Sequence, residues 1–306
     1  MIRSSVPFVS APDQPVQGVL WMLATTISFV GVNIIVHFIG TSIPTVQNAF
    51  LRFAWGWLFL APAILALRHR RFPPRVWGLF GLRGAVHAVA VILWFYAMAR
   101  VPMADVTAIG YLNPIVVTIG GALLLGEGFA WRRGLAIVIG LVGGLIILRP
   151  GLREIEPGHI AQLGAALFFG IAYIVAKGLT RFASPGDIVA MMTVTVTLVL
   201  APFAIAVWVP LTWAQVGWIG LTAAFATLGH YCMTRAFACA PVTVTQPVTF
   251  LQLVWASMAG WLLFGETVDP YVILGGGLII TAVSYMTWRE AATRRQLTPV
   301  VPATKV

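Results

Sequence analysis

Apolar runs of about 20 residues follow one another along almost the whole chain, and they restrict its fold more than any other feature. There are ten of them, at 17–39, 45–67, 76–99, 102–125, 131–149, 158–181, 186–208, 212–238, 241–264 and 270–289. A helix of about 20 apolar residues spans the hydrocarbon core of a bilayer. Only 9% of the residues are charged, whereas a soluble domain carries about 25%. We therefore predict an all-α integral membrane protein with ten transmembrane helices.

One of these stretches occurs twice. Residues 95–127 align with residues 234–266 at an offset of 139 positions, so that the run LL-x-GE is repeated and Asn113 falls on Gln252. The first and sixth spans match at an offset of 140, with Phe29 on Phe169 and Asn33 on Tyr173. A self-similarity of this length indicates two copies of one structural unit. We predict a first five-helix repeat at 17–149 and a second at 150–289, flanked by tails at 1–16 and 290–306.

The basic residues lie in the short loops between the apolar runs. With the N-terminus inside, the inside loops hold 14 of the 19 Lys and Arg residues and the outside loops hold three, while Arg52 and Arg83 lie within spans. This bias is the pattern of membrane topology, so it predicts two cytoplasmic tails and a multi-pass membrane protein. It does not favour a nucleic-acid partner. Five helices per copy then insert the second copy upside down, and inverted repeats of this kind build secondary transporters.

The paired amides Asn113 and Gln252 are the main candidates for a binding site. Each lies near the middle of its span, so inversion brings both to the bilayer midplane, where such transporters bind substrate at the repeat interface. An amide in hydrocarbon needs a partner, so each side chain either lines a wet cavity or bonds a neighbouring helix. Both alternatives stay open. Pro114 removes a backbone hydrogen bond directly after Asn113, which predicts a kink.

Other polar and aromatic positions follow from the same repeat. The predicted substrate cavity is completed by Asn33, Tyr173, Tyr111, Thr249, Trp255 and His230. The candidates for proton coupling or gating are His87, His230 and Asp105, since intramembrane ionisable groups mark such pathways. For each histidine a structural role is the competing interpretation. We interpret Glu127 and Glu266, which end the two LL-x-GE runs, as structural residues at helix ends.

Several motifs are absent. The sequence has no GxxxxGK[ST], no HExxH, no GxSxG and no zinc spacing of Cys and His, so we predict no cofactor, no metal site and no enzyme. Its Gly-Gly pairs at 120–121, 143–144 and 275–277 indicate close helix packing. The partners that we expect are a small organic solute and the lipid bilayer, with a homodimer as a possible assembly. A lipid-modifying enzyme and a non-transporting assembly subunit are the rival interpretations.

The repeated signature, in which Ala99 and Pro102 match Ala238 and Pro241 and the run LL-x-GE follows in both halves, resembles the EamA-type transporters of the drug/metabolite transporter superfamily. The resemblance covers about residues 17–289, and the Gly-Glu endings at Glu127 and Glu266 are its most specific part. It implies a bacterial inner-membrane carrier with a central cavity shared by two halves. The substrates that it implies are diverse: amino acids, vitamins such as riboflavin, other metabolites and toxic compounds. It assigns neither a substrate nor a direction of transport.

Overall fold

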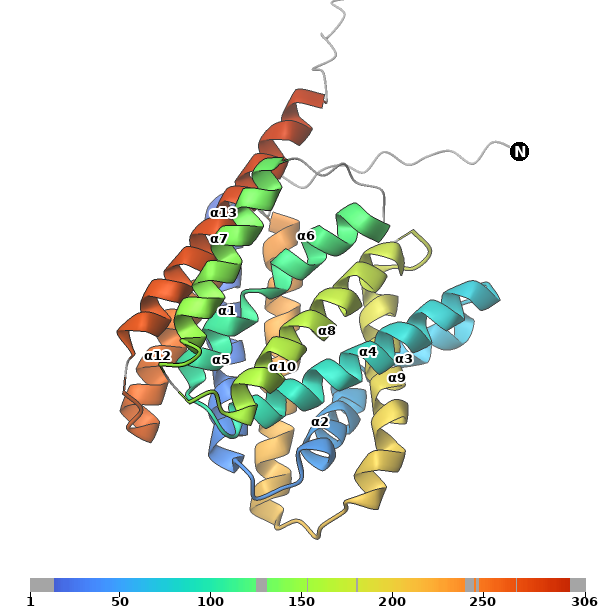
Figure 1. Cartoon of the computed structure of the whole chain (residues 1–306). Helices are drawn as coiled ribbons and strands as arrows, with labels where there is room; N and C mark the ends of the chain where they lie inside the picture. The colour runs from blue at the N-terminus through green and yellow to red at the C-terminus, as the bar shows by residue number, and fades with distance from the viewer. Residues whose placement is uncertain are drawn as a thin grey trace, which may run out of the picture.

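Helices are the regular elements of this protein. The computed structural model describes residues 14–124, 131–152, 154–179, 181–239, 245, 248–267 and 269–297. The helices are α1 (Pro15–Ile39), α2 (Thr45–Phe59), α3 (Ala61–Ala66), the 3₁₀ turn η1 (Leu67–His69), α4 (Pro74–Met98), α5 (Met103–Gly110), α6 (Asn113–Leu124), α7 (Trp131–Leu148), α8 (Pro157–Leu179), α9 (Pro185–Ala206), α10 (Trp213–Cys239), α12 (Leu251–Phe264) and α13 (Pro270–Leu297). Every predicted span carries one of these helices or a pair of them, which confirms the all-α class (Figure 1).

Four of the described helices are long and apolar enough to cross a bilayer by themselves: α1, α4, α8 and α9. A fifth span exists if α2 and the α3–η1 segment are taken together, although they are bent by 76°. The bend follows from Pro62 in the first turn of α3, because proline has no N–H for the preceding turn. The predicted span 45–67 is therefore a broken helix. The full count of ten spans stays a prediction.

The fourth predicted span is broken as well. α5 ends at Gly110 and α6 begins at Asn113, so Tyr111 and Leu112 form the turn between them. Pro114 explains this position, since a proline cannot donate to the carbonyl four residues earlier, which here belongs to Gly110. The kink that the sequence predicts is confirmed, one turn before the proline. At the other end of the chain α13 continues to Leu297, eight residues past the predicted boundary at 289.

The packing of the helices is unchanged when the two halves are exchanged. α1 packs on α10, and its counterpart α8 packs on α4 (Figure 1). Three pairs, α2 with α9, α5 with α12 and α7 with α13, each join one predicted span to its own counterpart. The pairs α4–α9 and α6–α8 correspond to α10–α2 and α12–α1 under the same exchange. Such a pattern requires an approximate two-fold axis between the halves. The two-repeat architecture predicted from the duplicated stretch is therefore present in the contacts.

Glycines set the distance between α7 and α13. A Cβ atom placed on Gly143 would lie 2.6 Å from the carbonyl oxygen of Gly275, and one placed on Gly275 would meet the carbonyl oxygen of Gly143. Backbone atoms cannot rotate away as a side chain can, so both positions must be small. The interpretation as close packing is confirmed for Gly143 and Gly275, whereas a Cβ atom on Gly277 would have nothing within 4 Å.

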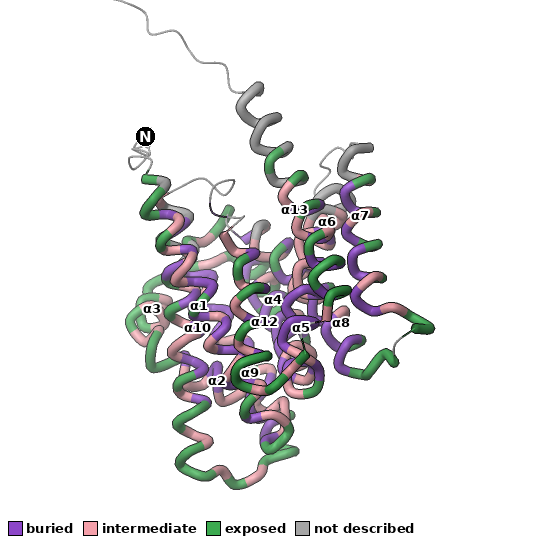
Figure 2. The backbone as a smooth tube through the Cα atoms, turned by 90° about the vertical axis from the view of Figure 1, so that its left-hand side faces the viewer, coloured by how far each residue is buried: buried purple, intermediate pink, exposed green. Residues whose placement is uncertain are grey.

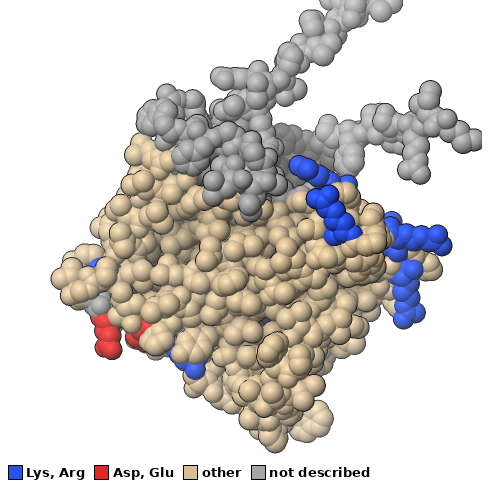
Figure 3. Space-filling view, turned by 45° about the vertical axis from the view of Figure 1, so that its right-hand side comes forward, with Lys and Arg blue, Asp and Glu red and all other residues tan. Residues whose placement is uncertain are grey.

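The surface has an apolar belt between charged ends. Large apolar side chains such as Leu20, Leu82 and Leu145 are exposed along the outer faces of the helices, while the buried residues face the centre of the bundle (Figure 2). Arginine and lysine gather at one end of the face seen in Figure 3, and acidic residues with a few basic ones lie at the opposite end. The exposed arginines 68, 70, 71 and 75 belong to the basic end, whereas Glu154 and Glu156 belong to the other. A belt of this kind is what a bilayer solvates.

Candidate functional site: a buried basic cavity and a closed end

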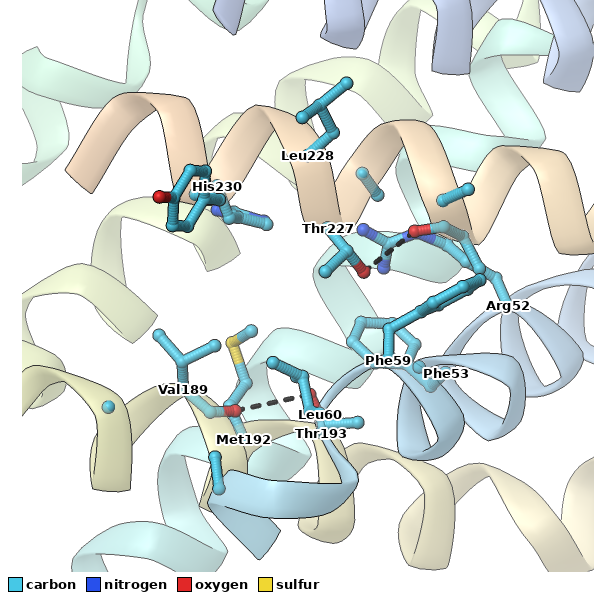
Figure 4. A pocket seen from close by; sticks show the side chains of 17 residues that line it. Arg52, Phe53, Phe59, Leu60, Val189, Met192, Thr193, Thr227, Leu228 and His230 are labelled. Atoms are coloured by element: carbon cyan, nitrogen blue, oxygen red, sulfur yellow. Dashed lines mark hydrogen bonds between the residues drawn. The ribbon is translucent and has the colours of Figure 1, made fainter. Parts of the chain in front are cut away.

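A cavity of about 600 Å³ lies between α2, α3, α9 and α10 (Figure 4). Most of its wall is apolar, with Phe53 and Phe59 on one side and Val189 and Met192 on the other. The polar groups on the wall are few: Arg52, Thr193, Thr227, His230 and Tyr231. Thr193 and Thr227 each donate their hydroxyl to a carbonyl one turn earlier in their own helix, at 3.2 and 2.9 Å. Arg52 and His230 are therefore the groups that distinguish this wall from a plain apolar pocket.

Arg52 is the charged group of the cavity. Its side chain extends from α2 toward Thr227 on α10 (Figure 4). The residue is only 8% exposed, and its Nε atom is buried without a hydrogen-bond partner. Its guanidinium stacks on the neighbouring Phe53 ring, 4.4 Å from the centroid. This cation is held in a pocket of low polarity with donor capacity left unused.

A second buried arginine lies close by. Arg83 on α4 donates to the carbonyl of Ile188 at 2.7 Å, and its Nε atom is also buried without a partner. Arg52 and Arg83 both act electrostatically on two histidines, His87 of α4 and His230 of α10. Two guanidinium groups and two imidazoles are thus gathered in the middle of the bundle.

The two histidines occupy matching environments. His230 meets the edge of Phe29 with 5.2 Å between ring centroids, and His87 meets Phe169 at the same 5.2 Å. Phe29 and Phe169 are the residues that the sequence repeat places on each other. The pseudo-symmetry therefore gives each half one histidine packed on the first helix of the other half. This pairing was not visible in the sequence, because the histidines themselves lie one turn out of register.

The remaining predicted cavity residues lie elsewhere in the bundle. Asn33 is buried with its Oδ1 atom unpartnered, and the Nε1 atom of Trp255 is buried without a partner. Tyr173 is about half exposed and stacks on Phe169. Asn113 and Gln252 are half-buried in the first turns of α6 and α12. Of the predicted cavity residues only His230 lines the 600 Å³ cavity, so a substrate role for the others stays a prediction.

Tyr111 joins the turn between α5 and α6 to the residues just before α12. The Tyr111 hydroxyl donates to the carbonyls of Thr249 and Phe250, at 3.3 and 3.4 Å. The Tyr111 ring also meets Phe250 edge-on, with 5.2 Å between centroids. Tyr111 and Phe250 are equivalent positions of the repeat, so the approximate two-fold axis passes between them. The Phe250 carbonyl also accepts from the Leu253 N–H at 3.1 Å.

The LL-x-GE run of the second half forms a turn that aims a carboxylate at the first half. Gly265 ends α12 in the left-handed region at φ +66°, and the Glu266 N–H then donates to the Gly260 carbonyl at 3.0 Å. A Cβ atom on Gly260 would collide with the Glu266 carboxylate, which explains why glycine stands there. The carboxylate accepts from the Met103 N–H at 3.1 Å and lies 3.3 Å from His37 Nε2. Glu127, the counterpart in the first half, lies outside the described residues.

A single hydrogen lies between the side chains of His37 and Glu266. His37 Nδ1 lies 2.6 Å from the Met98 carbonyl, which can only accept, so Nδ1 carries a hydrogen. Nε2 faces a carboxylate oxygen, and two lone pairs would repel each other there. Either the imidazole is protonated or the carboxyl is; in both forms a single hydrogen lies between them. Burial raises the pKa of Glu266, Asp105 raises it further, and the Met103 N–H and His37 act in the opposite direction.

Asp105 lies at the same end and has a histidine partner that the sequence did not reveal. His159, in the first turn of α8, is buried with its Nε2 atom 3.0 Å from Asp105 Oδ2. The backbone N–H of Glu156 donates to His159 Nδ1 at 3.2 Å, so Nε2 carries the hydrogen and donates to Asp105. A third contact between the halves, the ion pair of Arg149 with Asp269, joins α7 to α13. Together with the two hydrogen bonds between the Gln47 side chain and the Val209 backbone, each 2.9 Å long, these three contacts tie the halves together at the end opposite the basic loops.

Apolar helices in two exchangeable halves, with a buried basic cavity between them, define the class as an integral membrane carrier rather than a soluble binding protein. The EamA-like transporter family matches residues 16–149 and 156–288, so the chain belongs to the EamA-like transporter family.

Named relatives cover nearly the whole chain. A riboflavin transporter of Vibrio cholerae is 28% identical over 94% of this chain and 99% of its own length. An S-adenosylmethionine uptake transporter of Rickettsia bellii is 23% identical over 89% and 94%, and a pseudopaline exporter of Pseudomonas aeruginosa is 26% identical over 87% and 94%. A solved crystal structure shares the fold, with a TM-score of 0.58 at 17% identity over 90% of this chain and 96% of that one. The chain is thus a small-solute transporter of the drug/metabolite transporter superfamily.

Proposed function

We propose that this protein moves a small organic solute across a bacterial inner membrane by alternating access, with ten spans arranged as two inverted five-helix repeats and both termini in the cytoplasm. The observation that carries the proposal is that several polar contacts close one end of the bundle, while the cavity reaches toward the other end, where the half-exposed Arg70 pairs with Asp187 across the halves. The closing contacts include His37–Glu266, Asp105–His159 and Arg149–Asp269. The cavity runs from Arg52 to Gly186, beside the arginine-rich loops.

This arrangement describes an inward-facing carrier. The arginine-rich end is cytoplasmic by the charge bias, so the cavity opens inward and the closing contacts lie at the outer end. The exchangeable helix pairs provide the second conformation, since swapping the roles of the halves opens the outer end and closes the inner one. A proton gradient and solute exchange both stay open as driving forces. A named relative is an uptake transporter and another is an exporter, so the direction is open too.

The flat apolar walls with few polar groups suit an organic solute better than an inorganic ion. Asn113 and Gln252 keep their proposed place at the substrate path, in the first turns of α6 and α12. Asn33, Tyr173, Thr249 and Trp255 stay with them as proposed wall residues.

Counterflow in liposomes tests the transporter and its path. The purified protein is reconstituted without ATP, the vesicles are loaded with one unlabelled solute, and uptake of the labelled solute is followed for riboflavin, S-adenosylmethionine and amino acids. We expect accumulation of at least one solute by wild-type protein, and loss of this accumulation in Asn113→Ala and Gln252→Ala at unchanged expression. Val254→Ala, on the exposed face of α12, is the matched control. Normal counterflow in both amide variants would remove these residues from the path.

A further inference from the structure

Positive charge without a counter-charge among the described side chains is the unexplained feature of the cavity. Arg52 and Arg83 are 8% and 6% exposed. Among the acidic side chains that the structure describes, each buried one has a partner elsewhere: Asp105, Asp187, Glu266 and Asp269 pair with His159, Arg70, His37 and Arg149. Glu154 and Glu156 are exposed in the loop before α8. No described carboxylate is left for the two arginines.

A buried cation in this state is costly, because desolvation of a guanidinium is offset only by an opposite charge or by full hydrogen bonding. Arg83 obtains part of the hydrogen bonding that it needs from the Ile188 carbonyl, at 2.7 Å. Arg52 has less: its Nε atom is unpartnered, and it is the arginine on the cavity wall. The guanidinium fork matches the oxygens of a carboxylate or a phosphate in geometry as well as in charge.

The rest of the wall indicates the shape of the occupant. Next to Arg52 stand Phe53 and Phe59, and Met192 lies across the cavity (Figure 4). These side chains accept a flat or bulky apolar body but offer it no hydrogen bond. A ligand for this cavity therefore combines one anionic end with an apolar or aromatic remainder, as ligand sites with few polar groups generally demand.

We propose that Arg52 is the docking point for an anionic group, a carboxylate or a phosphate, of the transported solute. Arg83 adds a second positive charge nearby, since both arginines act on the same two histidines. This inference rests on the proposed function, because it names the chemical class of the solute that the cavity carries. An anionic lipid headgroup has the same chemistry, so the experiment must distinguish a lipid from a free solute.

Matched pairs of probes test the charge requirement. The full-length protein is placed in nanodiscs of phosphatidylcholine, and dissociation constants are measured by calorimetry for riboflavin 5′-phosphate against riboflavin and for 3-phenylpropionate against 3-phenylpropionamide. Each pair keeps the ring and changes only the charged group. We expect the anionic member of at least one pair to bind about tenfold or more tightly than its neutral partner, since hydrogen bonds to charged groups contribute about 1.5–3 kcal/mol. Equal affinities within every pair, or binding of no anion at all, would overturn the proposal.

The variants separate docking from structure. Arg52→Gln should weaken binding of the anionic member by about ten- to a hundredfold and change binding of the neutral member by less than about twofold. Arg52→Lys should recover part of the loss, because it restores the charge without the fork. Arg100→Gln, at an exposed arginine stacked on Tyr96, is the control and should change neither. An equal loss for both members in Arg52→Gln would assign Arg52 a structural role and refute docking.

Two further arms identify the source of failure. Nanodiscs with phosphatidylglycerol in place of half the phosphatidylcholine should leave solute affinity within about threefold; complete loss would assign the site to a lipid headgroup and overturn the solute assignment. Counterflow of the same probes is then compared. Transport of a neutral probe but of no anion would refute the anion site while the transporter itself stands. Anion binding to Arg52 without counterflow of any solute would keep the site and refute the proposed function.

Discussion

The contact of Glu266 with α1 and α5 permits a quantitative test of the closed end. Glu266→Ala removes both the acceptor of the Met103 N–H and the partner of His37. Hydrogen bonds to a charged group contribute about 1.5–3 kcal/mol each, and these side chains are 18% and 14% exposed, so we take about 2–3 kcal/mol for the two together. A loss of that free energy lowers the ratio of closed to open molecules roughly 30- to 150-fold.

Glu266→Gln should behave differently. Its carbonyl oxygen can still accept from Met103, and its amide can donate to His37 Nε2, as the protonated carboxyl does. Hydrogen–deuterium exchange of the amides at the start of α5 measures closure directly. We expect exchange at Met103 to accelerate by about 30-fold or more in the alanine variant and to stay within about threefold of wild type in the glutamine variant. Unchanged exchange in Glu266→Ala, or equal acceleration in both variants, would refute a closure that depends on a shared proton.

The same pair predicts a pH dependence. Burial raises the pKa of Glu266 in the folded protein. The Glu266 carboxyl therefore stabilises the folded protein fully at a pH below its unfolded-state pKa of about 4.3. This stabilisation is lost as the pH rises through the higher pKa of the folded state. The melting temperature of wild type relative to Glu266→Gln should therefore fall as the pH rises from about 4 to 7. A difference that is constant over this range would contradict the raised pKa.

Three further perturbations test other contacts. Gly275→Ala should destabilise the protein, because overpacking against a facing backbone costs about 1–3 kcal/mol and exceeds the gain of about 1 kcal/mol in helix propensity. Gly277→Ala, in open space on the same helix, should not destabilise it. The melting temperatures of the two variants test this difference. Tyr111→Phe should lower stability by about 1 kcal/mol in chemical unfolding by losing its hydroxyl bonds to the Thr249 and Phe250 carbonyls, and no change would mean that these bonds carry no net energy. His159→Ala removes the donor that His159 supplies to the buried Asp105 carboxylate, so it should lower the free energy of unfolding by about 2–4 kcal/mol. The double variant with Asp105→Asn should recover part of this loss. Absence of recovery would mean that the two residues do not interact energetically.

The sequence predicted the features that depend on local pattern. Apolar runs located the helices, the 139-residue offset located the repeat, and Pro114 indicated the break in the fourth span. The glycine pairs were assigned to packing because small residues on apolar helices rarely have another use. Each of these follows from properties of neighbouring residues along the chain.

The site could not be predicted in the same way. Its contacts join residues far apart in the chain, and they depend on the rotation of each helix about its own axis. His37 and Glu266 are 229 positions apart, and Asp105 and His159 are 54 apart. The sequence places Arg52 within an apolar span that we expected to be straight. In the structure this span is broken between α2 and α3, and Arg52 lies on the cavity wall. One signal was present: two arginines inside apolar runs with no acidic residue at a helical spacing from either.

The bond from Tyr111 to the residues just before α12 has a consequence for the resting state of the carrier. Tyr111 donates its hydroxyl to carbonyls of the second half, but Phe250, the residue in its place there, has no hydroxyl to return. When the halves exchange conformations, the mirror image of this bond cannot form. In the alternating access proposed above, this one bond would contribute about 1 kcal/mol to the difference in free energy between the two conformations, which corresponds to a fivefold change in their populations. A single oxygen atom is thus one source of asymmetry in a duplicated architecture.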